Sequence, residues 1–427
     1  MNGKDHPRPR RVVVTGMGAV TSLGADLDGI WSALLDGRSG VAEIRQFDSR
    51  PFPVRIGSEV PPELAGDDGR LLPRAARFGL EALRRAWRDA ALDGGAGLDP
   101  WRSGLCIGCS SFPVMEDRVD NVRGLLDGDR LHTANYLQEI RRRPELLGQR
   151  DMAAVSALLS EGYPLRGLSM TVQAACTSAT QAIGESFQAI RRGEADLMVT
   201  GGTDSLLSVA CLTGFTLLGA LSAWQGDPAV ASRPFDRKRD GFVLGEGAGI
   251  LVLEELEHAR ARGAEVRAEI LGYGSSSDGY RFTDMHPEGL GAARCMQAAL
   301  ASAGLAPGEI DYINAHGTST PLNDRIETLA IKRVLGEHAY EVPVSSNKSQ
   351  LGHLICAAGG IEMILTVLTL QRRVLPPTLN LEHPDPECDL DYVPNRCRPA
   401  EPRVALSNSF GFGGQNGTLV VRRWEEA

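Results

Sequence analysis

In Thr171-Val172-Gln173-Ala174-Ala175-Cys176-Thr177-Ser178-Ala179, an apolar run typical of a β-strand gives way to a helical pattern. The helical part carries one apolar stripe: Ala179, Ile183, Phe187 and Ile190. The stretch therefore predicts a strand, a turn and a helix, with Cys176 near the helix N-terminus. There, unpaired N–H groups and the positive end of the helix dipole favour a thiolate over a thiol and can hold an oxyanion. Cys176 is predicted to be a nucleophile, although a buried structural cysteine is the commoner fate of a cysteine taken alone.

Strand-like apolar runs alternate with helical patterns along the whole chain. Strands that are apolar on both faces and alternate with helices indicate layered α/β sheets covered on both sides. Two similar α/β blocks are predicted, over residues 12–262 and 263–427, behind a disordered basic lead at residues 1–11. The boundary falls in the charged segment 254–263, where the apolar runs pause. The expected elements are strands at 11–16, 197–202, 251–254, 266–272 and 310–315, and helices at 78–91, 291–303 and 357–371.

Composition excludes several classes of protein. The chain has 427 residues, 42% hydrophobic and 23% charged, enough to bury a large core. Its net charge of −9 argues against general nucleic-acid binding. No apolar stretch approaches the roughly 20 residues that span a bilayer. The first eleven residues are charged and lack a secretion segment, so a cytoplasmic protein without membrane association is predicted.

Neither the cysteines nor the glycine-rich loops indicate a cofactor. Eight cysteines stand without a framework pattern and are expected to be free thiols. The pair Cys106 and Cys109 lacks a second pair or histidines at zinc spacing, so its structural interpretation is preferred and no metal is predicted. The loops at 15–20 and 241–249 lack the remaining residues of dinucleotide and phosphate-binding motifs, so no nucleotide is expected.

Three polar clusters follow strand-like runs downstream of Cys176, at residues 314–321, 345–353 and 408–416. Active sites in α/β proteins gather where strands end and loops begin. His316, Lys348 and His353 lie in these clusters, so one cysteine and two histidines are expected to converge with a lysine. Each has an ordinary structural or surface interpretation when taken alone. All of those interpretations would have to hold together, which favours a catalytic site.

With these motifs the chain resembles the elongating, type II β-ketoacyl-acyl carrier protein synthases of the thiolase superfamily. The resemblance extends from Val12-Val13-Val14-Thr15-Gly16-Met17-Gly18 to the loop Phe410-Gly411-Phe412-Gly413-Gly414. It implies a thiolase fold of five layers, αβαβα, built from two similar halves and usually found as a dimer. The family's catalytic cysteine, His-Gly-Thr-x-Thr histidine, Lys-Ser lysine and Gly-His histidine match these residues: Cys176, His316, Lys348 and His353.

The resemblance also implies a decarboxylative Claisen condensation in two half-reactions, without a cofactor. Cys176 would first take an acyl group from phosphopantetheine, with the N–H groups of Cys176 and Phe412 as the oxyanion hole. Malonyl on an acyl carrier protein would then lose CO₂ beside His316 and His353. Two Nε2–H donors would stabilise the enolate without a metal, and its carbanion carbon would attack the acyl-cysteine.

Supporting roles follow from the same resemblance. Lys348 is expected to orient a histidine and to pair with Glu327 rather than to act as a base. Thr318 and Thr320 resemble residues that bind the pantetheine arm, and Phe412 resembles the family's gating phenylalanine. The loop 275–287 would move with it, and it carries Asp278 and Thr283 at matching positions. The carrier protein of this family is acidic, so three arginines are candidate docking residues: Arg70, Arg74 and Arg77.

Residues 112–166 fit the family poorly, and Gln173, Ala174 and Gln415 depart from the commonest fatty-acid pattern. These departures favour a specialised polyketide-type synthase, either a homodimer or the catalytic subunit of a heterodimer with a chain-length-factor-like partner. The alternatives are a housekeeping fatty-acid elongating synthase and a non-catalytic chain-length-factor-like subunit, which would be expected to lack Cys176. A degradative thiolase would need a second catalytic cysteine near the C-terminal loop, and a carrier-binding scaffold would leave the four catalytic matches unexplained.

Overall fold

The computed structural model describes residues 10–64, 66, 72–94, 97–110, 126–127, 130–142 and 152–426. Most of the predicted basic lead, residues 1–9, lies outside these ranges. So do Arg70 and much of the divergent stretch 112–166.

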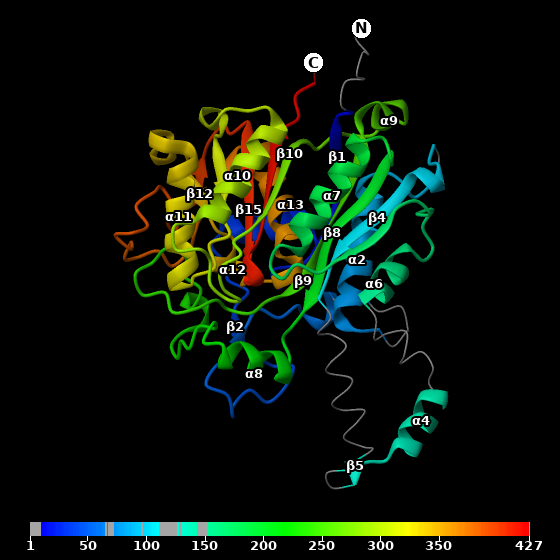
Figure 1. The fold of residues 1–427 in the computed structure, drawn as a ribbon, viewed down its shortest axis with the longest axis vertical. Coiled ribbons are helices and arrows are strands. Elements are labelled where there is room, and N and C mark those ends of the chain that lie inside the picture. The colour runs from blue at the N-terminus through cyan, green and yellow to red at the C-terminus, as the bar shows by residue number, and fades with distance from the viewer. Residues whose placement is uncertain are drawn as a thin grey trace.

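Ten strands form one hydrogen-bonded sheet (Figure 1). The strand order divides into two halves of five strands each, which we call the two sides of the sheet. The first side contains, in spatial order, β7 (Ser169–Val172), β4 (Ser103–Gly108), β8 (Leu197–Ser205), β9 (Glu246–Glu255) and β1 (Val12–Val20). The second contains β10 (Ala268–Ser277), β16 (Gln415–Arg423), β15 (Val404–Gly411), β11 (Tyr312–Asn314) and β12 (Val344–Ser345). The two sides meet where β1 pairs with β10, antiparallel and over only three residues of each strand. This narrow seam joins the two α/β blocks.

Helices lie between and outside the two sides of the sheet. Helices α7 (Ser178–Arg191) and α13 (Ala358–Arg372) contact strands of both sides and form the middle layer. Helix α2 (Arg74–Asp89) packs on β1, β8 and β9. Helix α10 (Leu290–Ala303) packs on β10 and β16, and α11 (Pro321–Leu335) lies against α10. The order of layers is therefore αβαβα, as predicted.

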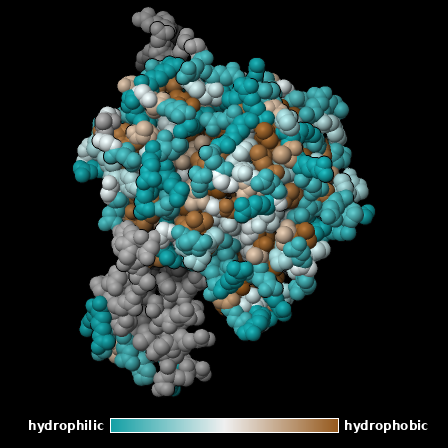
Figure 2. Space-filling model, turned by 180° about the vertical axis from the view of Figure 1, so that it is seen from behind, coloured by the Kyte–Doolittle hydropathy of each residue, from teal (hydrophilic) through white to brown (hydrophobic). Residues whose placement is uncertain are grey.

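Helix α13 is buried on all sides from Ala358 to Leu370. The segment Ile355–Arg372 is long and apolar enough to cross a membrane by length and composition, but 89% of it is buried inside the protein. A central helix covered by both sides of the sheet needs apolar side chains all round, which explains this composition. Seen from behind, the surface is mostly hydrophilic, with apolar side chains in small groups (Figure 2).

The remaining elements are short or lie in the connections. They are α1 (Leu27–Leu35), β2 (Ala42–Glu43), β3 (Ile56–Gly57), β5 (Leu126–Asp127), β6 (Arg130–Leu131), α4 (Thr133–Arg142), α6 (Met152–Ser160), α8 (Val209–Leu217), α9 (Leu256–Ala261), α12 (Lys348–Leu351), β13 (Val374–Leu375) and β14 (Arg398–Pro399). Two 3₁₀ turns border the candidate site, at Ile355–Ala357 and Phe412–Gly414.

The expected strands and helices are present, with ends that differ by a few residues. Helix α11 was not predicted, although its start carries a clear signal. Pro321 occupies the first turn, and the Thr320 side chain accepts a hydrogen bond from the Asn323 N–H at 3.3 Å. Proline at the first position and a threonine cap together favour a helix start. The turn that carries His316 is therefore held between β11 and a capped helix.

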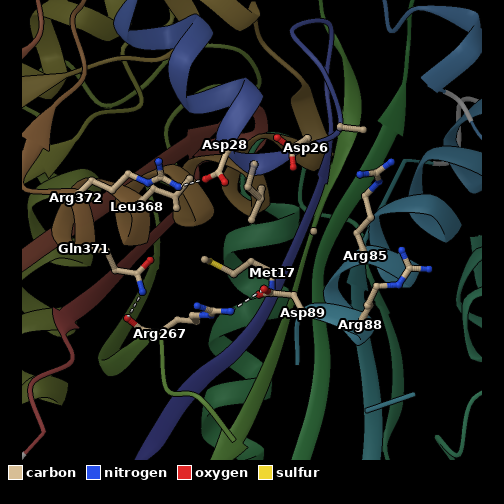
Figure 3. Close-up of a pocket in the computed structure, with 13 residues that line it drawn as sticks. Met17, Asp26, Asp28, Arg85, Arg88, Asp89, Arg267, Leu368, Gln371 and Arg372 are labelled. Carbon is tan, nitrogen blue, oxygen red and sulfur yellow. Dashed lines mark hydrogen bonds and ion pairs between the residues drawn. The ribbon is translucent and has the colours of Figure 1, made fainter. Parts of the chain in front are cut away.

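A surface cavity lies where the two α/β blocks meet, and Figure 3 shows the charged residues that line it. Arg267, just before β10, donates to Asp89 of α2 at 2.8 Å. The other Asp89 oxygen accepts from the Met17 N–H of β1 at 2.9 Å. Asp89 thus connects an outer helix, the strand at the seam and the start of the second block. Arg372 is likewise paired, with Asp28 of α1.

Candidate active site

Cys176 lies on a tight turn between β7 and α7, as the sequence predicted. Thr177 is the N-cap of α7, so Cys176 immediately precedes the helix. Ala175 has φ of +49°, a conformation that costs a non-glycine residue free energy. The Ser178 hydroxyl holds this conformation, since it donates to the Ala175 carbonyl at 2.7 Å and accepts from the Ala174 N–H at 2.9 Å. Cys176 is therefore presented by a strained turn that hydrogen bonds fix.

His353 is the nearest polar neighbour of the cysteine. Its Nε2 lies 3.0 Å from the Cys176 sulfur, and both residues are buried. The His353 N–H donates to the Val243 carbonyl at 2.7 Å, and the His353 carbonyl accepts from the Gly245 N–H at 3.0 Å. These two bonds hold the backbone of His353, whereas the buried Nδ1 of its ring has no hydrogen-bond partner among the described residues.

His316 and Lys348 complete the cluster that the sequence predicted. The rings of His316 and His353 are 5.2 Å apart and nearly perpendicular. Lys348 Nζ lies 3.4 Å from His316 Nδ1. Because an ammonium can only donate, this contact makes Nδ1 the acceptor and leaves the proton on Nε2. Burial first, and the charge of Lys348 second, hold the pKa of both histidines well below the usual value. Both imidazoles are therefore neutral.

The predicted ion pair between Lys348 and Glu327 is wrong. Lys348 pairs with Glu362, which reaches it from the central helix α13. The two carboxylate oxygens of Glu327 instead accept from the His316 N–H at 2.9 Å and the Gly317 N–H at 2.8 Å. Burial raises the pKa of Glu327 to about 7. Glu327 supports the His316 turn, and its oxygens are already used by backbone donors.

Cys176 does not have the ionisation that the helix end alone suggests. Burial raises the pKa of its thiol to about 11, against the lowering effects of Lys348 and of the Phe412 and Cys176 N–H groups. The expectation of a thiolate is thus corrected to a neutral thiol in this closed pocket, because desolvation outweighs the nearby donors. Both N–H groups lie near the sulfur, and an oxyanion hole requires them to reach the oxygen of an acyl group bound to it.

The ligand atoms of Cys176, His316 and His353 lie within 4.8 Å of one another, close enough to surround a metal ion. The neighbouring charge argues against that use. A histidine bound to a metal through Nε2 carries its proton on Nδ1 and donates it to an acceptor. At His316 that position faces the Lys348 ammonium, another donor. The cluster therefore fits a negatively charged oxygen better than a cation.

A cavity opens above the cysteine and contains most of the predicted substrate residues. Thr283, Thr318, Thr320 and Phe412 line it, together with Cys176, His316 and His353. The two threonine hydroxyls of residues 318 and 320 lie 2.9 Å apart.

The two predicted gating loops contact each other. The Asp278 N–H donates to the Gly414 carbonyl at 2.9 Å, and the Gly413 N–H donates to the Phe282 carbonyl at 2.6 Å. Gly413 and Gly414 have φ of +78° and +74°, a region that glycine adopts without strain. Asp278 therefore lies beneath the loop that carries Phe412, outside the lining of the cavity.

The candidate docking arginines differ in their exposure and contacts. The Arg74 side chain is only 24% exposed and forms an ion pair with the buried Glu246. A guanidinium so occupied has less capacity for an external partner, and docking by Arg74 stays a prediction. Arg77 is partly buried and remains a candidate, and Arg70 lies outside the described residues.

Sequence reasoning missed Glu362 and Asn408. Asn408 of β15 donates to Glu327 at 3.3 Å, and its oxygen accepts from Thr418 at 2.9 Å. Glu362 could have been found, because an acidic residue in an otherwise apolar helix needs a cation beside it.

The five-layer fold and the cluster of a cysteine, two histidines and a lysine define a thiolase-fold condensing enzyme. Two protein-family models match the chain and place it within this class. "Beta-ketoacyl synthase, N-terminal domain" matches residues 9–259, and "Beta-ketoacyl synthase, C-terminal domain" matches residues 267–382. The chain belongs to the beta-ketoacyl synthase family and is an acyltransferase.

Individual relatives agree with this assignment. The chain is 42% identical over 421 residues to "3-oxoacyl-[acyl-carrier-protein] synthase 2" of Coxiella burnetii, which covers 97% of this chain and 99% of the relative. Among solved structures, it is similar to a type II polyketide ketosynthase complex with its acyl-carrier protein, AntDE:AntF, at 33% identity and a TM-score of 0.88. That match covers 98% of this chain and 100% of the other. "The ishigamide ketosynthase/chain length factor" matches with 33% identity and a TM-score of 0.83, covering 98% and 100%. Ketosynthases of this family act on carrier-bound substrates and need no added cofactor.

Proposed function

We propose that this enzyme condenses malonyl on an acyl carrier protein with an acyl chain held on Cys176, with loss of CO₂. One observation carries the proposal. A cysteine sulfur lies 3.0 Å from one neutral imidazole, and a second neutral imidazole lies beside the first in the same buried cavity. This set supplies a nucleophile and two N–H donors, which is what the two half-reactions require.

In the first half-reaction, the Cys176 sulfur attacks the thioester carbonyl of the acyl-carrier substrate. The thiol is neutral, so its proton leaves during attack, and His353 Nε2 is the base within reach at 3.0 Å. The developing oxyanion accepts hydrogen bonds from the Cys176 and Phe412 N–H groups. Collapse of the intermediate expels the pantetheine thiolate, which takes the proton back from His353. The products are acyl-Cys176 and the free carrier thiol.

In the second half-reaction, malonyl-carrier protein binds beside the acyl-cysteine. Cleavage of the carboxylate releases CO₂ and leaves an enolate, whose oxygen accepts hydrogen bonds from His316 Nε2–H and from His353 Nε2–H. For this step the neutral His353 ring carries its proton on Nε2, the tautomer opposite to the one that acts as base in the first half-reaction. The carbanion carbon attacks the acyl carbonyl and expels the Cys176 thiolate, which takes up one proton from solvent to restore the thiol. Lys348 acts on His316 from the far side, because its ammonium keeps the proton of that imidazole on Nε2.

Substrate delivery is assigned to the residues around the mouth of the cavity. Thr318 and Thr320 offer hydroxyls to the pantetheine arm. Phe412 acts as the gate, and movement of its glycine-containing loop would be coupled to Asp278 and to the loop of Thr283. Arg70, Arg74 and Arg77 remain candidate docking residues for the carrier protein.

The pathway is proposed from the degree of similarity. The curated relatives named 3-oxoacyl-[acyl-carrier-protein] synthase 2 share 40–42% identity, which favours fatty-acid elongation. Polyketide biosynthesis is the second candidate, since ketosynthases of that pathway share the fold over the full chain at 33% identity. The earlier preference for a polyketide pathway therefore stays a prediction, as does the cytoplasmic location.

A dimer is proposed through strand β7. This strand pairs only with β4 and leaves its other edge unpaired within the described residues. Met170 in β7 and Leu168 just before the strand are 36% and 37% exposed. An open edge with apolar side chains is a template for pairing with another chain. We propose a second copy as the partner, with a chain-length-factor-like subunit as the alternative.

Mass spectrometry after incubation with acyl-carrier proteins of graded chain length tests the proposal. The expected result is one acyl mass gain on the peptide that contains Cys176, absent in Cys176→Ala and present in the control Cys397→Ala. The preferred acyl group then distinguishes the two pathways. A mass gain that persists in Cys176→Ala would contradict the nucleophile assignment.

A further inference from the structure

Asp204 is a buried carboxylate to which the proposed mechanism gives no role. It lies near the end of β8 and is 0% exposed. Within the described part of the chain, no lysine, arginine or histidine forms an ion pair with it. Burial raises its pKa to about 6, so keeping the anion inside the protein costs free energy. A group retained under such a cost is a candidate for a functional role.

Its contacts connect three segments of the chain. One oxygen accepts from the Ser110 hydroxyl at 2.7 Å and from the Ser205 N–H at 3.0 Å. The other oxygen accepts from the Cys356 N–H at 3.0 Å. Cys356 lies three residues after His353, in the 3₁₀ turn that leads into α13. That helix has no side-chain cap of its own, so Asp204 supplies from β8 the negative charge that a helix N-terminus favours.

A second link leads from Cys356 to the turn of the nucleophile. Burial raises the pKa of the Cys356 thiol most, and the thiol lies near both Asp204, which raises that pKa further, and Ser178, which lowers it. Ser178 is the residue whose hydroxyl holds the strained backbone of Ala174 and Ala175. Asp204 is thus hydrogen-bonded to Cys356, and the Cys356 thiol lies beside Ser178; we call these three residues the Asp204 network. It connects the segment of His353 to the turn of Cys176.

We propose that Asp204 is a positioning residue that fixes the distance between the Cys176 sulfur and His353 Nε2. The inference rests on the proposed roles of those two residues. Asp204 does not touch the substrate and acts only through the two backbone segments that it joins. A change of geometry remote from the reacting atoms lowers catalysis about 100-fold when it displaces them by about 1 Å.

Asp204→Asn tests the proposal, because an amide keeps the shape but can accept on one side only. With the amide oxygen held on the side of the two donors, Ser110 and Ser205, the NH₂ group would face the Cys356 N–H. The expected result is a fall in kcat of about 100-fold per active site, with little change in KM for malonyl-carrier protein. Active sites are counted by the acyl-Cys176 formed after long incubation, so a folding defect does not imitate the effect.

Two further variants separate the links. Ser110→Ala removes one donor to Asp204 that does not lead to His353, and it should retain wild-type kcat. Cys356→Ala should lower kcat less than Asp204→Asn because the backbone N–H remains, and Cys356→Ser should restore it. Wild-type kcat per active site in Asp204→Asn would overturn the proposal and leave the role of Cys176 intact. A loss of active sites with unchanged kcat per site would show a purely structural role and would overturn it too.

Discussion

Lys348 is buried, and its positive charge forms an ion pair with the buried Glu362. The Lys348 ammonium of this pair contacts His316 Nδ1. The tautomer of the histidine that would stabilise the enolate therefore depends on the charge balance between Lys348 and Glu362. Removal of one partner from a buried pair leaves an uncompensated charge, which is more damaging than the loss of a surface pair.

Glu362→Gln is therefore expected to lower the free energy of unfolding by about 3 kcal/mol. It should also slow decarboxylation of malonyl-carrier protein by about 100-fold, because the lysine no longer holds His316 in one tautomer. Urea denaturation and CO₂ release measure the two effects. Glu382→Gln, an exposed glutamate elsewhere, is the control and should change neither. Unchanged CO₂ release in Glu362→Gln would remove the link between this pair and His316.

The ionisation of Cys176 gives a second prediction. A thiol whose pKa is raised to about 11 is neutral at pH 7 and becomes a thiolate only as the pH approaches 11. Alkylation of Cys176 by iodoacetamide in the free enzyme should therefore rise about tenfold per pH unit from pH 7 to 10, without a plateau. Mass spectrometry of the Cys176 peptide measures this rate. A plateau below pH 9 would show that the N–H groups and Lys348 outweigh burial.

At the residue scale, the sequence predicted which residues form the site better than it predicted their ion-pair partners. Cys176, His316, Lys348 and His353 come together as expected, because the strands that precede them, β7, β11 and β12, end at the same site. The partner of Lys348 was misassigned between two buried glutamates. Which glutamate faces the ammonium depends on how α11 and α13 pack in three dimensions, and no local pattern encodes that.

At the scale of elements, the two α/β blocks are joined by a few contacts that each involve more than one element. Asp89 is the clearest case, since it accepts from β1 and from the residue that precedes β10 (Figure 3). The backbone of β1 is irregular there, with a register shift between Val14 and Gly16 against β9. Asp89 and Arg267 thus stabilise a seam where only three residue pairs join the two sides.

Arg267→Ala is expected to lower the free energy of unfolding by about 1 kcal/mol. The guanidinium is 22% exposed and contacts both Asp89 and Glu265, so solvent screens the interaction only in part. Arg192→Ala, which removes an exposed pair with Glu194, is the matched control and should cost less than about 0.5 kcal/mol. Urea denaturation measures both variants. Equal losses in the two would show that the seam gains nothing from this ion pair.

Elements with strong periodicity were predictable, and those with polar surroundings were not. Helices α2, α10 and α13 carry continuous apolar stripes and appear near their expected positions. Helix α11 contains buried polar residues, among them Asp324 and Glu327, which disguise its apolar face in sequence. The same polar residues support the active site, so residues kept for function hide the apolar pattern of α11 in the sequence.

At the scale of the whole molecule, the two halves meet around the middle layer and form the site together. Cys176 comes from the first half, whereas His316, Lys348, His353 and Phe412 come from the second. The proposed boundary at residues 262 and 263 lies in the connection between α9 and β10, and it stays a prediction. Because the residues of the site come from both halves, neither half alone would hold a complete site.

The free edge of β7 gives the last prediction, because it is where the sheet can continue into another chain. β7 leads directly into the turn of Cys176, so pairing at this edge would also stiffen the segment that carries the nucleophile. A charged side chain on an edge strand opposes such pairing. Met170→Lys should therefore convert a dimer into a monomer, as measured by analytical ultracentrifugation of the chain expressed alone.

Leu329→Lys is the matched control for that substitution, since Leu329 on α11 is 41% exposed but lies away from the sheet edge. It should leave the dimer intact. If wild-type protein is a monomer when expressed alone and dimerises only with a chain-length-factor-like subunit, the proposed homodimer is wrong and the heterodimer takes its place. If Met170→Lys remains a dimer with wild-type affinity, the interface lies elsewhere on the molecule. In that case the rigidity of the Cys176 turn depends on the contacts within one chain, among them the Asp204 network.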